Sequence, residues 1–142
     1  MKSLNIAIAG LGTIGSGVAH ILEEHEKYSD SKINLVRILE NNFNSKKAQI
    51  WMNKKTELFC TDPKIIIENP EIDVIVETIG GKEFSRELII KALENGKHVI
   101  TANKDLIAVH GKELTDIARK NDRHLLFEAA VAGAIPVLRL LK

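Results

Sequence analysis

In IAIAGLGTIGSGVAHILEEH, residues 6–25, three glycines have the spacing G-x-G-x-x-G between an apolar segment and a helical one. Gly10 is expected to make the tight turn, Gly12 to let the backbone approach a pyrophosphate, and Gly15 to let helix and strand pack closely. The helix N-terminus would offer unpaired N–H groups and the positive end of its dipole to phosphates. The motif predicts a dinucleotide site, and a strand-to-helix turn without a ligand is the alternative.

Short apolar runs alternate with longer segments of helical periodicity, which is typical of parallel strands joined by crossover helices. The strand candidates are residues 6–9, 35–39, 74–77, 98–101 and 125–127. Two helices should cover the sheet with apolar faces made of Ile14, Val18, Ile21 and Leu22 in the first, and Phe84, Leu88, Ile89, Ala92 and Leu93 in the second. The pattern predicts an α/β fold of the Rossmann type, a doubly wound and mainly parallel sheet with helices on both faces.

Local signals set the ends of the remaining segments. Gly96 should end the helix that begins near Ser85, and Asp62 should cap a short helix with Pro63 at its first position. The apolar pattern after residue 105 is interrupted by Gly111, which predicts two helical pieces. Residues 40–61 are polar and rich in asparagine, so part of this region is expected to be helical and part a loop.

Length and composition limit the classes of protein that the chain can be. Its 142 residues suffice for one domain, here residues 1–142, and 44% hydrophobic with 27% charged residues is ordinary for a globular protein. The formal net charge of +1 gives no bulk attraction to nucleic acid or an anionic membrane. The apolar start is broken by glycines too early for a secretory signal. The single cysteine, Cys60, favours a reducing interior such as the cytoplasm.

An acidic residue at the end of the second strand is the next part expected of a dinucleotide site, since it would accept hydrogen bonds from the adenosine ribose. Glu40 occupies that place. Asn41 follows it, where an NADP site often has an arginine, so NAD is slightly favoured over NADP. Two alternatives stay open, because Lys46 and Lys47 could turn toward a phosphate and a glutamate at a strand end is often simply solvated.

Two stretches in the second half place polar residues after buried strands, VETIGG at residues 76–81 and KHVITANKDLIAVHG at residues 97–111. The carboxyl ends of parallel strands line the ligand crevice in this architecture. A lysine there, Lys104, could orient a carbonyl substrate or exchange a proton if partial burial lowered its pKa, and a plain surface lysine is the alternative. The predicted cofactor-binding residues are Gly10, Gly12, Thr13, Ile14, Gly15, Glu40, Asn41, Thr78, Gly80, Thr101, Asn103 and Lys104.

Four motifs together make the chain resemble the nucleotide-binding part of homoserine dehydrogenase. They are GLGTIGSGVA at residues 10–19, VETIGG at 76–81, GKHVITANKDLIAVHG at 96–111 and LFEAAVAGAIPVL at 126–138. Their order and spacing cover nearly the whole chain, and residues 40–61 alone lack clear similarity. The glycine motif by itself would indicate only a dinucleotide-binding domain.

The resemblance implies NAD(P)-dependent interconversion of L-homoserine and L-aspartate 4-semialdehyde. It gives Lys104 the catalytic lysine's place in the T-A-N-K motif, beside nicotinamide and substrate. It also implies a monovalent cation such as Na⁺, held by a carboxylate and three backbone carbonyls. The matching positions are Glu128, Val131, Gly133 and Ile135. A tight packing loop is the alternative for that segment.

The resemblance further implies a substrate domain after Lys142, so we expect the chain to be a fragment that binds cofactor and turns over little by itself. The full-length relatives are usually homodimers. Partners other than the small-molecule substrate, such as nucleic acid or membrane, are not expected. Two alternatives are an aspartate dehydrogenase or dihydrodipicolinate reductase type of enzyme, and a non-catalytic nucleotide-sensing module.

Overall fold

The chain is built on a parallel sheet, which a computed structural model describes over residues 3–28 and 32–128. Six strands lie within these ranges in the spatial order β3-β2-β1-β4-β5-β6, and every neighbouring pair is parallel. The strands are β1 (Leu4–Ala9), β2 (Ile33–Leu39), β3 (Phe59–Cys60), β4 (Val74–Glu77), β5 (His98–Thr101) and β6 (Leu125–Leu126). The order reverses between β1 and β4, which confirms the predicted doubly wound Rossmann-type fold.

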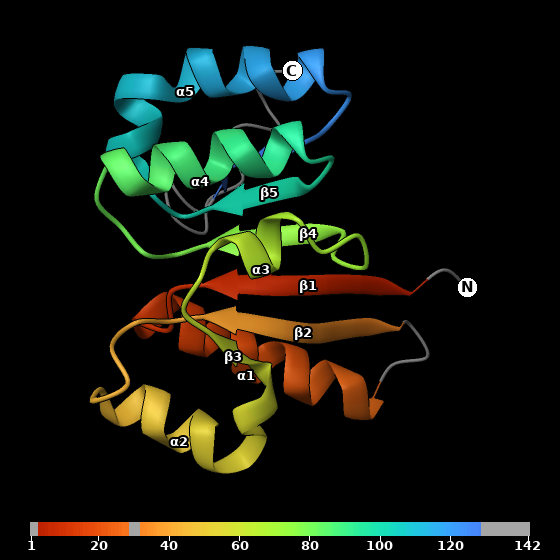
Figure 1. The fold of residues 1–142 in the computed structure, drawn as a ribbon, viewed down its shortest axis with the longest axis vertical. Helices are drawn as coiled ribbons and strands as arrows, with labels where there is room; N and C mark the ends of the chain where they lie inside the picture. The colour runs from red at the N-terminus through yellow and green to blue at the C-terminus, as the bar shows by residue number, and fades with distance from the viewer. Residues whose placement is uncertain (1–2, 29–31, 129–142) are drawn as a thin grey trace.

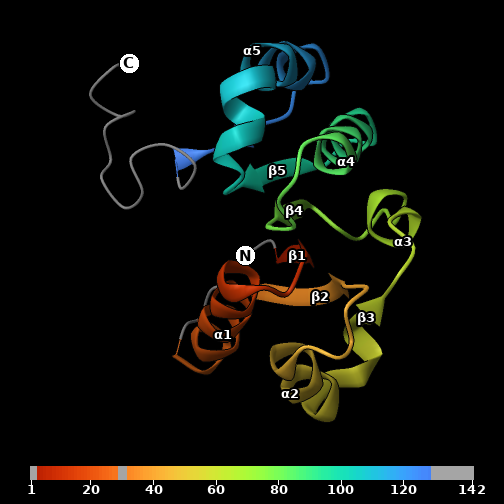
Figure 2. The same ribbon diagram turned by 90° about the vertical axis from the view of Figure 1, so that its left-hand side faces the viewer.

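Helices cover both faces of this sheet, as Figures 1 and 2 show. They are α1 (Thr13–Tyr28), α2 (Lys46–Lys55), α3 (Lys64–Ile67), α4 (Glu83–Glu94) and α5 (Lys104–Lys120), with a 3-10 turn η1 (Thr56–Leu58) after α2. Alternate residues of β1 separate the two cores. Ile6 and Ile8 pack with α1 and α2, whereas Ala7 and Ala9 pack with α3, α4 and α5. Burial on both faces explains why the central strands are continuous apolar runs.

Several predicted elements are confirmed and others are corrected. The fourth and fifth strands have the predicted bounds, and Gly96 follows α4 with a φ of +77°. The short helix begins at Lys64, one residue later than the predicted position, and the Asp62 carboxylate accepts a hydrogen bond from the Lys64 N–H at 2.9 Å. Within the region that was expected to mix helix and loop, the structure adds the short edge strand β3.

The predicted break at Gly111 is wrong, because α5 runs unbroken from Lys104 to Lys120. A glycine inside a helix costs only about 1 kcal/mol relative to alanine. The buried face of Leu106, Leu114 and Ala118 packs against the rest of the core on both sides of that position and outweighs this cost.

The predicted inner face of α1 is also partly wrong. Ile14 and Ile21 are 54% and 67% exposed, while Ala19 is fully buried and Val18 and Leu22 pack against the core. The buried stripe of the helix is therefore rotated toward Gly15 and Ala19.

None of the helices within residues 3–28 and 32–128 is both long and apolar enough to cross a lipid bilayer.

Candidate functional site: a crevice at the sheet switch point

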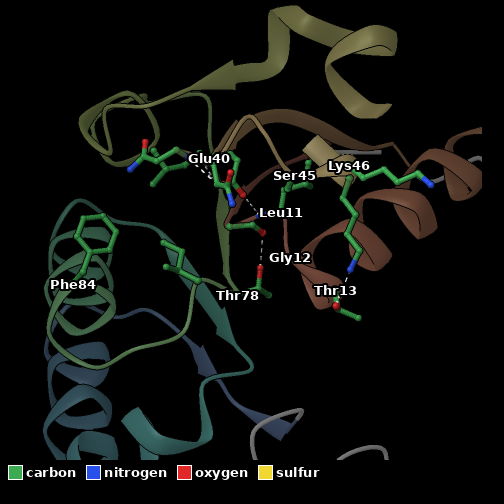
Figure 3. A pocket seen from close by; sticks show the side chains of 14 residues that line it. Leu11, Gly12, Thr13, Glu40, Ser45, Lys46, Thr78 and Phe84 are labelled. Carbon is green, nitrogen blue, oxygen red and sulfur yellow. Dashed lines mark hydrogen bonds between the residues drawn. The ribbon is translucent and has the colours of Figure 1, made fainter. Parts of the chain in front are cut away.

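A pocket of about 640 Å³ opens where the carboxyl ends of β1, β2 and β4 meet. This is where the strand order reverses and where open α/β sheets bind ligands, and the volume suits a small-molecule ligand. Figure 3 shows Phe84 across the opening from Ser45 and Lys46. The lining residues are Gly10, Leu11, Gly12, Thr13, Leu39, Glu40, Asn41, Asn42, Ser45, Lys46, Lys47, Thr78, Ile79 and Phe84.

The three motif glycines have the distinct environments that their spacing predicts. Gly10 has a φ of +92°, and a Cβ there would lie 2.9 Å from the Ile79 backbone. A Cβ on Gly15 would lie 1.9 Å from the Gly10 carbonyl oxygen, so this glycine lets α1 pack directly on the turn. A Cβ on Gly12 would meet no described atom within 4 Å. Gly12 therefore keeps the pocket floor open.

Positive groups surround the first turn of α1. Thr13 is the first residue of that helix, where backbone N–H groups lack intrahelical acceptors. Lys47, in the first turn of α2, donates a hydrogen bond from Nζ to Thr13 Oγ1 at 2.7 Å. Lys46 lines the same pocket. The Lys47 ammonium beside a helix N-terminus, with a second lysine in the pocket lining, favours a ligand that carries phosphate.

The Glu40 carboxylate at the end of β2 binds the backbone of two loops. Its Oε2 accepts from the Leu11 N–H at 2.7 Å, and its Oε1 accepts from the N–H groups of Asn41 and Asn42 at 2.8 and 2.7 Å. A carboxylate has about four lone-pair sites, so Oε2 keeps capacity for one further donor. Glu40 thus fixes the glycine loop and lies in the pocket wall at the same time.

The opposite wall comes from the loop between β4 and α4. Thr78 Oγ1 donates to the Gly10 carbonyl at 2.7 Å, which ties this wall to the glycine turn. Phe84 was expected to cover the sheet, but this residue is 46% exposed and lines the pocket. The buried face of α4 consists of Ser85, Leu88, Ile89, Ala92 and Leu93. Phe84 precedes that face by one position and projects toward the crevice instead.

Six of the twelve predicted cofactor-binding residues lie outside the pocket lining, namely Ile14, Gly15, Gly80, Thr101, Asn103 and Lys104. Thr101 and Asn103 are buried and belong to a hydrogen-bond network around Glu77. Gly80 is in the exposed loop after β4 and has a φ of +82°. The structure therefore assigns Thr101 and Asn103 to the support of the loops that follow β4 and β5.

Comparison with known proteins shows which family the chain belongs to. Residues 10–128 match the family model described as homoserine dehydrogenase, NAD binding domain. The chain belongs to the homoserine dehydrogenase family. Within this family it corresponds to the NAD-binding domain, the part of these oxidoreductases that holds the dinucleotide.

Individual members of the family are similar in sequence to the whole chain. The homoserine dehydrogenases of Bacillus subtilis and Pseudomonas aeruginosa are 39% and 42% identical over 100% of the chain. A crystal structure of the Thiobacillus denitrificans enzyme superposes with a TM-score of 0.83 at 38% identity, covering 99% of this chain and 33% of that one. The chain spans about one third of the length of these curated relatives.

The predicted catalytic lysine, Lys104, and the predicted cation ligand Glu128 lie at the start of α5 and after β6. Lys104 begins α5 directly after its N-cap Asn103, and it is exposed where partial burial was expected. Glu128 is exposed, and the other three predicted cation ligands, Val131, Gly133 and Ile135, lie outside the described residues. Within the described ranges no group of three or more His, Cys, Asp or Glu is placed to hold a metal.

Sequence reasoning missed part of the pocket lining. Leu11, Leu39, Asn42, Ser45, Ile79 and Phe84 line the pocket but were not predicted to. One signal was available, because Ser45 accepts a hydrogen bond from the Ala48 N–H at 3.1 Å as the N-cap of α2, and serine before a helical segment indicates such a cap. Ile79 and Phe84 carried no signal, because exposed apolar side chains near a helix start fit a core face equally well.

We expect Gly15→Ala to lower the free energy of unfolding by at least about 2 kcal/mol, because the new methyl group overlaps a backbone carbonyl that cannot move freely. Urea denaturation followed by circular dichroism measures this. Gly17→Ala is the matched control, since its Cβ would enter open space in the same helix, and it should gain roughly 0.5–1 kcal/mol. Equal effects of the two substitutions would contradict the close packing of α1 on the turn.

Proposed function

We propose that the pocket binds the adenosine diphosphate half of NAD(P), and that the chain is the cofactor-binding part of an enzyme that interconverts L-homoserine and L-aspartate 4-semialdehyde. The observation that carries the proposal is the open space at Gly12 beside the first turn of α1. A pyrophosphate in that space would lie against bare backbone and the positive end of a helix dipole.

The remaining walls fit the other parts of the same ligand. Glu40 offers an acceptor to a ribose hydroxyl at the end of β2, and Lys46 and Lys47 offer positive charge to phosphate oxygens. The exposed ring of Phe84 and the side chain of Ile79 supply an apolar surface for a flat base. The pocket suits this ligand because positive charge, hydrogen-bond acceptors and apolar surface lie in one crevice, and no single side chain provides all three.

Once bound, NAD(P) supplies the hydride chemistry of the reaction, and the chain holds it in place beside the substrate. The loops after β4 and β5 lie on the opposite side of β1 from Glu40, on the half of the sheet where the nicotinamide end of a dinucleotide belongs. Lys104 stands at the start of α5 on that side. Its exposed ammonium would orient the substrate carbonyl and donate to the developing alkoxide.

Gly12→Ala should weaken NAD binding at least tenfold, because its methyl group projects into the space proposed for the pyrophosphate. Isothermal titration calorimetry of the protein expressed from its complete gene measures the change. Gly17→Ala is again the control, since it adds the same methyl group to α1 outside the pocket lining. Unchanged affinity in a folded Gly12→Ala protein would remove the dinucleotide assignment.

We also propose that the site prefers NAD to NADP. The Glu40 carboxylate beside the proposed ribose position would repel a 2′-phosphate, and Asn41 gives no compensating charge. Lys46 and Lys47 act in the opposite direction, so the preference should be modest.

Separate titrations with NAD and NADP test this preference. The unaltered protein should bind NAD more tightly, and Asn41→Arg should improve NADP binding by about tenfold through a charge-assisted pair with the phosphate. Asn44→Arg is a control, since it adds the same charge to an exposed neighbour outside the pocket lining. Equal affinities for both cofactors in all three proteins would exclude the proposed preference.

The activity itself is tested by L-homoserine-dependent reduction of NAD(P) in the protein expressed from its complete gene. Lys104→Met should lower kcat by about a hundredfold, the range typical of a lost proton donor or orienting group. NAD affinity should change less than threefold, because Lys104 does not line the adenosine pocket. Full activity of Lys104→Met would remove its catalytic role.

We also propose that the protein binds a monovalent cation, because the chain resembles homoserine dehydrogenase and the Glu128 carboxylate follows β6. Homodimer formation by the full-length protein is a further proposal, and it rests on the resemblance alone.

A further inference from the structure

Glu77, the last residue of β4, is a fully buried carboxylate that the proposed chemistry does not use. Its Oε1 accepts hydrogen bonds from the Ile79 N–H at 2.9 Å, the Gly80 N–H at 3.3 Å and Ser85 Oγ at 3.0 Å. Its Oε2 accepts from Thr101 Oγ1 at 2.6 Å. All these donors are uncharged. Burying a carboxylate is costly without such partners, so we asked what the buried Glu77 side chain does at the end of this central strand.

The partners of Glu77 belong to two loops that the carboxylate joins. Thr101 Oγ1, besides donating to Glu77, accepts from the Asn103 N–H at 3.0 Å. The Asn103 side chain donates from Nδ2 to the Gly81 carbonyl, and its Oδ1 accepts from the Leu106 N–H at 3.1 Å. The hydrogen bonds thus close a ring from Glu77 through Thr101 and Asn103 back to the loop after β4. We call this set, Glu77, Gly80, Gly81, Thr101 and Asn103, the Glu77 ring.

The Glu77 ring lies where it can shape one half of the crevice. Glu77 and Thr101 are paired at the carboxyl ends of β4 and β5, on the half of the sheet away from Glu40. The loop after β4 takes an unusual path, with φ values of +82° at Gly80 and +74° at Gly81. Glu77 binds the amide of Gly80 directly, and Asn103 holds Gly81. Lys104 follows Asn103 at the start of α5.

We propose that Glu77 is a positioning residue that holds Gly80 and Gly81 of the loop after β4 and the loop after β5 together as one rigid wall for the nicotinamide end of the cofactor. The proposal rests on the dinucleotide function proposed above. Glu77 itself does not touch the ligand, because its side chain has no exposed surface and does not line the pocket. It acts through the loop backbone and through Asn103, which caps the helix that begins with Lys104.

A carboxylate performs this task where an amide of the same shape cannot. All its hydrogen bonds are accepted from donors, and a glutamine would direct an NH₂ group at Thr101 or at the loop amides. One donor of the ring then loses its acceptor, and the loops lose their common anchor. On the adenosine side, Ile79 also donates to Glu77, whereas Glu40 and the bond from Thr78 to Gly10 hold the glycine turn without it.

Glu77→Gln in the protein expressed from its complete gene tests the proposal with two probes, NAD⁺ and ADP-ribose. The probes share the adenosine, pyrophosphate and second ribose, and they differ in the nicotinamide ring. We expect Glu77→Gln to weaken NAD⁺ binding at least tenfold and ADP-ribose binding less than threefold, by calorimetry. General loss of stability would weaken both ligands alike, so the ratio of the two affinities isolates positioning.

Two further variants complete the design. Ser85→Ala removes one donor to Glu77 and should shift the same ratio in the same direction by two- to fivefold, which keeps the test available if Glu77→Gln does not fold. Glu113→Gln breaks the exposed ion pair with Arg86 between α4 and α5, outside the ring, and should leave the ratio unchanged.

Different results would contradict the positioning role of Glu77 and the proposed dinucleotide function. A parallel loss of both ligands, or no loss of either, in folded Glu77→Gln and Ser85→Ala overturns the positioning role. Failure of the unaltered protein to bind ADP-ribose would instead overturn the proposed function. A changed ratio in Glu113→Gln would show that any disturbance of α4 and α5 has this effect, and it too would count against Glu77.

Discussion

The architecture of the site depends on one close approach, that of α1 to the turn after β1. Gly15 lies so near the Gly10 carbonyl that a side chain of any size would have to displace backbone. This contact brings the first turn of α1 down onto the end of the sheet and aims its free N–H groups into the crevice. The same turn receives the hydroxyl of Thr78 from the neighbouring loop. The glycines therefore locate the pocket before any side chain specifies its ligand.

Two glutamates at strand ends then organise the loops on either side of that turn. Glu40 ends β2 and accepts hydrogen bonds from the glycine loop and from its own following residues. Glu77 ends β4 and accepts from the loop after β4, from α4 and from β5. Loops at the carboxyl ends of parallel strands leave backbone N–H groups without ladder partners, and a carboxylate satisfies several at once. The loops around the crevice are therefore held in place by two carboxylates, Glu40 in the pocket wall and Glu77 buried behind it.

The distribution of charge follows from this arrangement. Glu40 keeps its negative charge in the pocket wall near the end of β2, whereas the positive influence near the start of α1 comes from Lys47 and the α1 dipole. A phosphate-bearing ligand fits that field. Family membership agrees, since the matching model describes an NAD-binding domain over residues 10–128.

Local pattern alone predicted the doubly wound sheet, the bounds of β4 and β5, the turn at Gly10 and the close packing at Gly15, because apolar periodicity and glycine spacing act within a few residues of the chain. Tertiary packing decided the rest. It kept α5 continuous through Gly111, turned Phe84 into the pocket, and buried Thr101 and Asn103 around Glu77. Each of these outcomes depends on neighbours twenty or more residues away or on the burial of a whole helix face, and single-residue propensities do not encode such contacts.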